Sequence, residues 1–169
     1  MQIKQQFTIN VSADKVWEIL GRQYAQVSEW ASAVHASQER NSGVIPQNAP
    51  CSGRICETDL GGFKETITQY DERGKVVSYT AQGDKMPFFV KNLANTWKVT
   101  PLGKDQSRVD MCMEISILPV FNLVMGPMMR MQMGGVSKKV TEELQHFAEK
   151  GVPHPRKLAA QQKYRLKLA

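Results

Sequence analysis

The sequence predicts an α+β domain in which a curved antiparallel sheet of about seven strands wraps around a long C-terminal helix. Apolar residues recur every three or four positions from Pro127 to Lys150, which places them along one face of a single helix. Upstream segments alternate apolar and polar residues between turn signals, as strands do. A helix of about 24 residues is roughly 36 Å long, so its apolar face needs a broad concave surface, which these strands can supply.

The first part of the chain predicts a strand followed by two short helices. The alternation from Ile3 to Val11 indicates the strand. Ser12 is a typical N-cap for the helix that follows. The expected buried side of this helix carries Val16, Trp17, Ile19 and Leu20. A second short helix, from about Gln26 to Ala33, carries Trp30.

Six further strands are expected before the long helix. The sequence Asp71–Gly74 is typical of a hairpin turn, with glycine where a positive φ is favoured. Residues 84–92, which include Met86 and Phe88, are expected to form a loop. The predicted strands are Val34–Arg40, Ser52–Thr58, Phe63–Tyr70, Lys75–Gly83, Asn92–Pro101 and Ser107–Leu118.

The period of two along each strand predicts which side chains face the helix. If the turn at Gly74 contains a bulge, Ile67 lies opposite Tyr79 on this concave face. Trp97, Met111 and Met113 then face inward as well. The concave face is therefore expected to be apolar except for Arg54, Glu65, Gln69, Tyr79 and Asn95.

Arg54 and Glu65 are the chemically informative members of this face. A lone buried charge is very costly, so two inward-facing charges should pair with each other or with water. The pair could merely satisfy itself, or it could bind the polar end of a ligand. Tyr79 could likewise orient a ligand oxygen or only fill space.

The start of the long helix is rich in methionine, a flexible side chain that suits variable apolar shapes. Met129, Met133 and Val136 lie on its main apolar stripe. These residues could fill a core or line a cavity.

Charge is distributed unevenly along the 169 residues. The net charge is +6 at pH 7, but the stretch from Val152 onward carries five basic residues and no acid, so the rest is nearly neutral. The folded part therefore lacks the basic stripe of a nucleic-acid-binding surface. We expect a ligand-binding domain over residues 1–151 and a basic tail over 152–169. The tail is expected to be a solvated extension, with an oligomer arm or a tether to anionic lipid as alternatives.

The cysteines and histidines predict neither a disulfide framework nor a metal site. Cys51 and Cys56 are expected on opposite faces of one strand, and Cys112 lies far away in the sequence. The three histidines lack ligand spacing. No apolar run is long enough to span a membrane, and the first residues lack the hydrophobic segment of a secretory signal, so a cytoplasmic location is expected.

With these features the chain resembles the SRPBCC or START-like helix-grip superfamily. This group includes polyketide cyclase/dehydrase-like proteins, lipid-transport proteins, birch-pollen allergens and plant abscisic-acid receptors. The resemblance covers roughly residues 3–151. The matching segments are Val16–Leu20, Arg54, Glu65–Ile67, Tyr70–Asp71, Ser78–Tyr79, Met86–Pro87, Asn95–Val99 and the final helix. Ala31 replaces the lysine of the abscisic-acid receptors, and their gate and latch sequences are absent, so the chain is not expected to be such a receptor.

The resemblance implies a cavity between the sheet and the long helix that binds a small hydrophobic molecule, lipid-like or polyketide-like. No cofactor or metal, no nucleic acid and no stable membrane association are expected from the residues, and the protein is expected to be a monomer or homodimer. The expected ligand-binding residues are Trp30, Arg54, Glu65, Ile67, Tyr79, Met86, Phe88, Asn95, Trp97, Met111, Met113, Met129, Met133 and Val136. One alternative is a cyclase/dehydratase-like enzyme, for which Glu65 with Tyr79 or Arg54 is the available acid–base set. A second is a protein–protein interaction module, which predicts a filled core.

Overall fold

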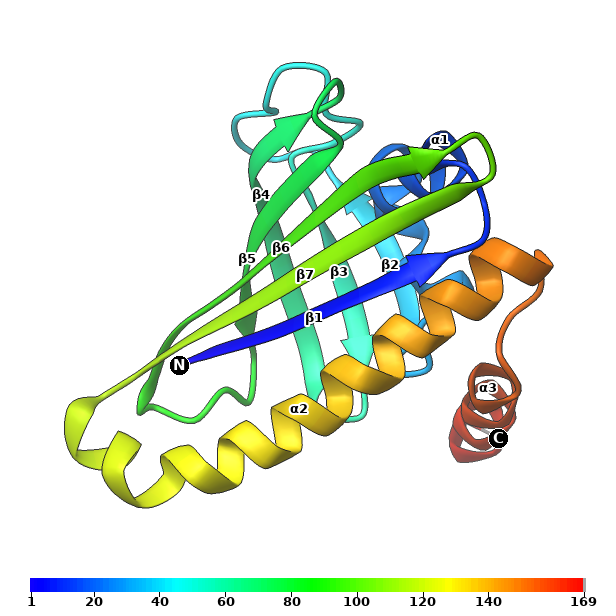
Figure 1. Cartoon of the computed structure of the whole chain (residues 1–169). Coiled ribbons are helices and arrows are strands. Elements are labelled where there is room, and N and C mark those ends of the chain that lie inside the picture. The colour runs from blue at the N-terminus through cyan, green and yellow to red at the C-terminus, as the bar shows by residue number, and fades with distance from the viewer. Residues whose placement is uncertain (169) are drawn as a thin grey trace.

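The computed structural model describes residues 1–168, with the side chains of all of these except Asn122 and Leu168. Its centre is a seven-stranded antiparallel sheet in the order β1-β7-β6-β5-β4-β3-β2, which curves around one face of the helix α2 (Figure 1). Every predicted strand is present, with its ends displaced by a few residues. The strands are β1 Gln2–Ile9, β2 Val34–Arg40, β3 Gly53–Thr58, β4 Gly61–Asp71, β5 Val76–Gly83, β6 Val90–Gly103 and β7 Gln106–Ile117.

Short helical segments connect β1 to β2, as the sequence predicts. Ser12 caps the first of them by accepting a hydrogen bond from the Lys15 amide at 3.3 Å. The expected second helix is a 3₁₀ helix that begins earlier than Gln26, and Trp30 follows its end. The segments are α1 Ala13–Trp17, the π-helical turn η1 Glu18–Arg22 and the 3₁₀ helix η2 Tyr24–Glu29.

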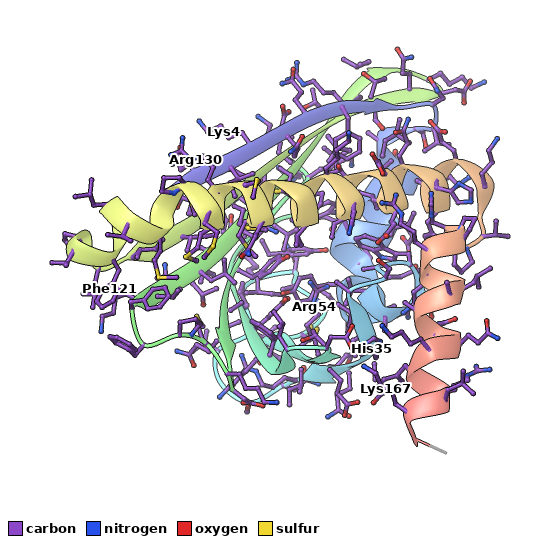
Figure 2. All side chains as sticks on the ribbon, turned by 90° about the horizontal axis from the view of Figure 1, so that it is seen from below. Lys4, His35, Arg54, Phe121, Arg130 and Lys167 are labelled. Atoms are coloured by element: carbon purple, nitrogen blue, oxygen red, sulfur yellow. The ribbon has the colours of Figure 1, made fainter. Side chains whose placement is uncertain are left out.

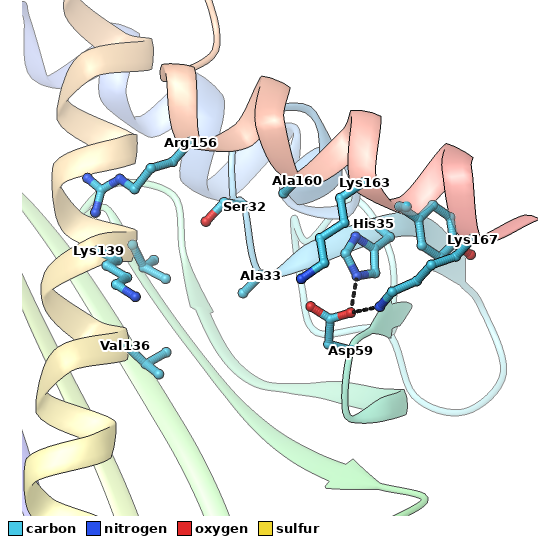
Figure 3. Close-up of a pocket in the computed structure, with 12 residues that line it drawn as sticks. Ser32, Ala33, His35, Asp59, Val136, Lys139, Arg156, Ala160, Lys163 and Lys167 are labelled. Atoms are coloured by element: carbon cyan, nitrogen blue, oxygen red, sulfur yellow. Dashed lines mark hydrogen bonds and ion pairs between the residues drawn. The ribbon is translucent and has the colours of Figure 1, made fainter.

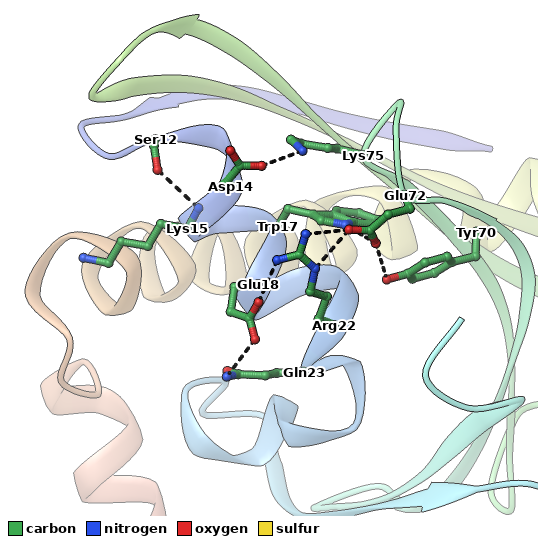
Figure 4. A network of polar contacts seen from close by, with 10 residues as sticks. All are labelled: Ser12, Asp14, Lys15, Trp17, Glu18, Arg22, Gln23, Tyr70, Glu72 and Lys75. Carbon is green, nitrogen blue, oxygen red and sulfur yellow. Dashed lines mark hydrogen bonds and ion pairs between the residues drawn. The ribbon is translucent and has the colours of Figure 1, made fainter. Parts of the chain in front are cut away.

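A polar cluster centred on Glu72 ties these segments to the turn after β4 (Figure 4). The Glu72 carboxylate accepts hydrogen bonds from Trp17 Nε1 at 2.8 Å, from Tyr70 Oη at 3.0 Å and from the Arg22 guanidinium at 2.6 Å. Burial raises the pKa of Glu72, but these three donors outweigh burial and hold the pKa below its usual value. The cluster therefore holds α1 and η1 against the end of β4 and the turn that follows it.

Helix α2 runs from Pro119 to Lys150, so it begins earlier than the predicted start at Pro127. Pro119 occupies the first turn, where proline is tolerated, whereas Pro127 lies inside the helix. An internal proline frees the carbonyl four residues earlier. That carbonyl belongs to Leu123, which is 85% exposed, so water can satisfy it. The predicted end is confirmed: Gly151 adopts a left-handed φ of 72°.

The two halves of α2 have different surroundings. Leu144 and Ala148 in the second half are fully buried against the core. The first half projects past the sheet beside the β5–β6 loop, at the lower left of Figure 1. Its side chains Val120, Val124 and Met131 are largely exposed. The continuous buried stripe that the sequence predicts is therefore present only in the second half.

The expectation of a solvated tail is wrong, because residues 155–168 form a helix, α3 (Pro155–Leu168), that packs on the edge strand β2. Lys157 is fully buried and donates a hydrogen bond to the carbonyl of Val34 at 2.6 Å. Tyr164 stacks on His35 with ring centroids 4.3 Å apart and donates to Glu57 at 2.8 Å. The helix packs through these polar and aromatic contacts, which leave no apolar stripe in the sequence of the tail.

The predicted register of β4 and β5 and the shared facing of Arg54 and Glu65 are confirmed close to the centre of the sheet. Ile67 pairs with Tyr79 and Arg54 pairs with Glu65. The pairing shifts by one residue between Ile67 and Gln69. This irregularity turns Gln69 to solvent, so its predicted place on the concave face is wrong.

Candidate ligand-binding cavity

A cavity of about 350 Å³ lies between the concave face of the sheet, η2 and the middle of α2. Its volume falls within the roughly 300–1,000 Å³ typical of small-molecule sites. Most of its lining is apolar, including Leu20, Val27, Phe63 and Val77. Most of the expected site residues line it as well: Trp30, Arg54, Glu65, Tyr79, Asn95, Trp97, Met111, Met113, Met133 and Val136.

Four expected residues do not line the cavity. Ile67 is buried in the core around it, and Met129 lies on a turn of α2 before the cavity begins at Met133. Met86 and Phe88 belong to the β5–β6 loop, beyond the end of the cavity. Phe88 is 72% exposed there and packs against Phe121, which Figure 2 shows near the start of α2.

One important lining residue, Tyr24, was missed by sequence reasoning. The second short helix was expected to begin at Gln26, so Tyr24 was left in a connection. Leu20, Tyr24 and Val27 follow the spacing of one helical face and all line the cavity. That spacing is the signal that could have identified it.

The cavity contains a buried ionic cluster, with Arg54 enclosed by the fold (Figure 2). Arg54 Nε donates to Glu65 Oε2 at 2.6 Å, and Tyr24 Oη donates to the same oxygen at 2.8 Å. The side chains of Arg54 and Glu65 are 8% and 13% exposed. The Arg54 guanidinium also lies 4.1 Å from the centre of the Tyr24 ring, a cation–π distance. Among residues 1–168 no hydrogen bond reaches the other carboxylate oxygen, Glu65 Oε1.

These surroundings determine the charge states of the cluster. Burial lowers the pKa of Arg54, but the charge of Glu65 outweighs burial, so the guanidinium stays protonated. Burial raises the pKa of Tyr24 well above its usual value, so its phenol is neutral at pH 7. The cluster therefore consists of a cation, a carboxylate acceptor and a neutral phenol donor.

A second polar pair lies further along the same wall. Asn95 Nδ2 donates to Tyr79 Oη at 3.1 Å, and burial raises the pKa of Tyr79 to about 12. The buried Oδ1 of Asn95 has no hydrogen-bond partner within the described part of the chain. An unpaired buried acceptor is costly, so this atom is a point where a ligand donor would be stabilised.

Other chemistry has little support in this cavity. Burial raises the pKa of the lining thiol of Cys56 to about 12, which makes it a poor nucleophile at neutral pH. No group of three metal-ligating side chains occurs within residues 1–168. Over the same residues, no helix is both long and apolar enough to cross a bilayer.

Solved structures share this architecture at low sequence identity. A START superfamily protein from Mycobacterium smegmatis superposes with a TM-score of 0.69 and 16% identity, covering 88% of this chain and 97% of the other. The protein XoxI from Bacillus cereus gives a TM-score of 0.68 and 16% identity, covering 86% and 93%. Truncated norcoclaurine synthase from Thalictrum flavum gives a TM-score of 0.65 and 15% identity, covering 89% of this chain and 94% of the other. At such identities the likeness concerns the fold alone.

Comparison of sequences leads to the same group of proteins. No curated protein matches the chain significantly. A family described as polyketide cyclase / dehydrase and lipid transport matches residues 1–150, which include the whole sheet and all of α2. The chain therefore belongs to the polyketide cyclase / dehydrase and lipid transport family.

Proposed function

We propose that the protein binds a small hydrophobic molecule, lipid-like or polyketide-like, in the cavity between the sheet and α2. The observation that carries this proposal is the apolar cavity of about 350 Å³ between the sheet and α2. Protein interiors are close-packed, and empty apolar volume destabilises a fold. A cavity of this size is consistent with a bound molecule, and it disfavours the alternative of an interaction module with a filled core.

The polar atoms of the cavity define what such a molecule should carry at its inner end. Glu65 Oε1 and Asn95 Oδ1 are both acceptors without a partner among the described residues. A hydroxyl or amine on the ligand would donate to either atom, and at the buried Asn95 Oδ1 it would remove the cost of leaving an acceptor unpaired. The rest of the ligand contacts aromatic and aliphatic side chains.

Fluorescence titration with the neutral probe N-phenyl-1-naphthylamine tests this function. We expect saturable one-to-one binding. Ala81, which lines the cavity, provides a variant that fills it: Ala81→Phe should abolish binding. Ala159→Phe, on the exposed side of α3, is the matched control and should bind normally. Absence of a saturable site in the unaltered protein would overturn the proposal.

A cyclase/dehydratase-like activity is the second candidate, favoured by the Tyr24–Glu65 hydrogen bond at 2.8 Å inside the cavity. A neutral phenol beside a carboxylate supplies a proton donor and a proton acceptor in one place. Native mass spectrometry of protein purified without denaturation would identify a bound molecule. Incubating that molecule with fresh protein then separates the two functions: an unchanged mass and chromatographic retention time support binding, loss of one water supports dehydration, and an isomer of equal mass supports cyclisation.

A further inference from the structure

A second pocket, of about 370 Å³, adjoins the apolar cavity on the side of α3 (Figure 3). Its walls are α2, α3, the start of β2 and the turn between β3 and β4. Ala33, Asp59, Val136 and Val140 line both the pocket and the cavity. These four shared residues place the pocket directly beside the cavity.

The lining of this second pocket is basic. It contains Lys139, Arg156, Lys163 and Lys167 but a single acidic residue, Asp59. Lys167 Nζ pairs with Asp59 at 2.9 Å, and Arg156 pairs with Glu142 outside the pocket. Lys139 and Lys163 have no ion pair among residues 1–168, which leaves two positive charges available at the pocket walls.

His35 gives independent evidence that the pocket receives a polar group. Its side chain is 5% exposed and lines the pocket, and its ring nitrogen Nδ1 has no hydrogen-bond partner in the described part of the chain. Nε2 lies 3.3 Å from Asp59 Oδ1, and Tyr164 covers one face of the ring. Buried polar atoms are rarely left without a partner. An anion in the pocket would accept a hydrogen bond from this imidazole.

We propose that the pocket lined by His35, Lys139 and Lys163 binds an anionic head group, a carboxylate or phosphate, of a molecule whose apolar body occupies the cavity. This inference rests on the proposed function and narrows the ligand to an amphipathic anion. Lys163 and Tyr164 come from α3, which lies outside the residues matched by the family. The head-group site is therefore a feature that this chain adds to the shared fold.

Two matched probes test the proposal: dansyl-labelled undecanoic acid and its methyl ester, which differ in the charge of the head group and by one methyl group. We expect the acid to bind about ten- to a hundredfold more tightly than the ester, as charge-assisted hydrogen bonds imply. The preference should shrink as sodium chloride is added. Equal affinity for acid and ester in the unaltered protein would overturn the head-group site and leave the cavity function standing. Failure of both probes to saturate would contradict the cavity function itself.

Charge-reversal variants locate the site. Lys139→Glu combined with Lys163→Glu should remove the preference for the acid and leave the affinity for the ester unchanged. Both lysines are exposed, so the fold should tolerate the change. Lys98→Glu combined with Lys104→Glu alters the net charge equally on exposed β6 and the turn after it, and should keep the preference. If both double variants weaken acid binding equally, long-range charge explains the preference and the proposal is wrong.

Competition distinguishes a head-group site from an independent anion site. Decyl phosphate should displace the dansyl acid at concentrations at least about a hundredfold below those of inorganic phosphate, because its chain also enters the cavity. Equal potency of the two phosphates would show that the pocket binds free anions without the cavity, which contradicts the proposal.

Discussion

Arg54 and Glu65 pair directly across β3 and β4, with Nε of the arginine 2.6 Å from Oε2 of the glutamate. Both side chains are almost fully buried and face the cavity. A buried pair of this kind does not necessarily stabilise a fold relative to apolar residues, but it becomes costly when one partner is removed. The pair therefore makes the cavity wall sensitive to single substitutions.

The first prediction is that Glu65→Gln lowers the free energy of unfolding by about 3 kcal/mol at pH 7, because Arg54 then lacks its counter-ion. Urea denaturation followed by circular dichroism measures the change. Glu114→Gln is the control, since this carboxylate is exposed on β7 and should cost no more than about 0.5 kcal/mol. Replacing both partners, with Arg54→Met and Glu65→Leu together, should restore much of the lost stability. A single Glu65→Gln variant as stable as the unaltered protein would contradict a buried ion pair.

That Arg54 and Glu65 share a face could be predicted from the sequence because local rules determine it. Alternation assigns each strand residue to one face of the sheet, and the length of a hairpin loop fixes which residues are opposite. Those rules put Arg54 and Glu65 on the concave face and Ile67 opposite Tyr79, as the structure has them, but they did not place Arg54 directly opposite Glu65. The same rules failed at Gln69, where a shift in pairing of one residue reverses the facing.

The features that were not predicted depend on contacts between distant parts of the chain. Tyr164 stacks on His35 and Lys157 bonds to the carbonyl of Val34, and neither contact leaves a periodic pattern in the tail. Phe88 was expected in the cavity from the family resemblance, yet it packs against Phe121 on the projecting start of α2. Packing of this kind follows from the assembled fold.

The second prediction concerns α3. Ending the chain after His154 should lower the melting temperature by roughly 5 °C or more. In a domain of this size each kcal/mol of lost stability lowers the melting temperature by about 2–4 °C, and we expect a loss of about 2 kcal/mol. The loss comes from the Tyr164–His35 stack and the hydrogen bond of buried Lys157. Differential scanning calorimetry provides the measurement.

A shorter truncation serves as the control for α3. Ending the chain after Tyr164 removes the exposed Lys167–Asp59 pair but keeps the stack. Exposed pairs contribute little, so this truncation should shift the melting temperature by no more than a few degrees. If the chain that ends after His154 melts at the same temperature as the unaltered protein, the contacts of α3 do not stabilise the domain.

The third prediction is a loss of stability at alkaline pH that depends on Cys56. Burial raises the pKa of this thiol from 9.0 to about 12. Below pH 9 the thiol is protonated in both states and contributes no pH dependence. Above pH 9 the unfolded chain releases the proton and the folded chain keeps it, so stability falls as pH rises, by up to about 1.4 kcal/mol per pH unit.

Urea denaturation at several values between about pH 8 and pH 10 tests this linkage. Over that interval Cys56→Ala should lose about 1 kcal/mol less stability than the unaltered protein. Cys112→Ala is the control, because this side chain is half-exposed, and it should follow the pH dependence of the unaltered protein. If stability falls equally steeply with pH in the unaltered protein and in both variants, Cys56 is not the source of that fall.

The final prediction uses Tyr24 to separate ligand binding from catalysis. Tyr24→Phe removes the hydrogen bond to Glu65 and keeps the ring that Arg54 covers, so stability should fall by about 1.5–3 kcal/mol. Affinity for N-phenyl-1-naphthylamine should change by less than about twofold, because that probe makes no use of a phenol that is already bonded to Glu65.

If the protein is instead an enzyme in which Tyr24 is the general acid, turnover of the co-purified molecule by Tyr24→Phe should fall by about two to four powers of ten while its binding survives. Tyr70→Phe, which alters a phenol outside the cavity, is the control for turnover. Unchanged turnover in the Tyr24 variant would remove this residue as the general acid.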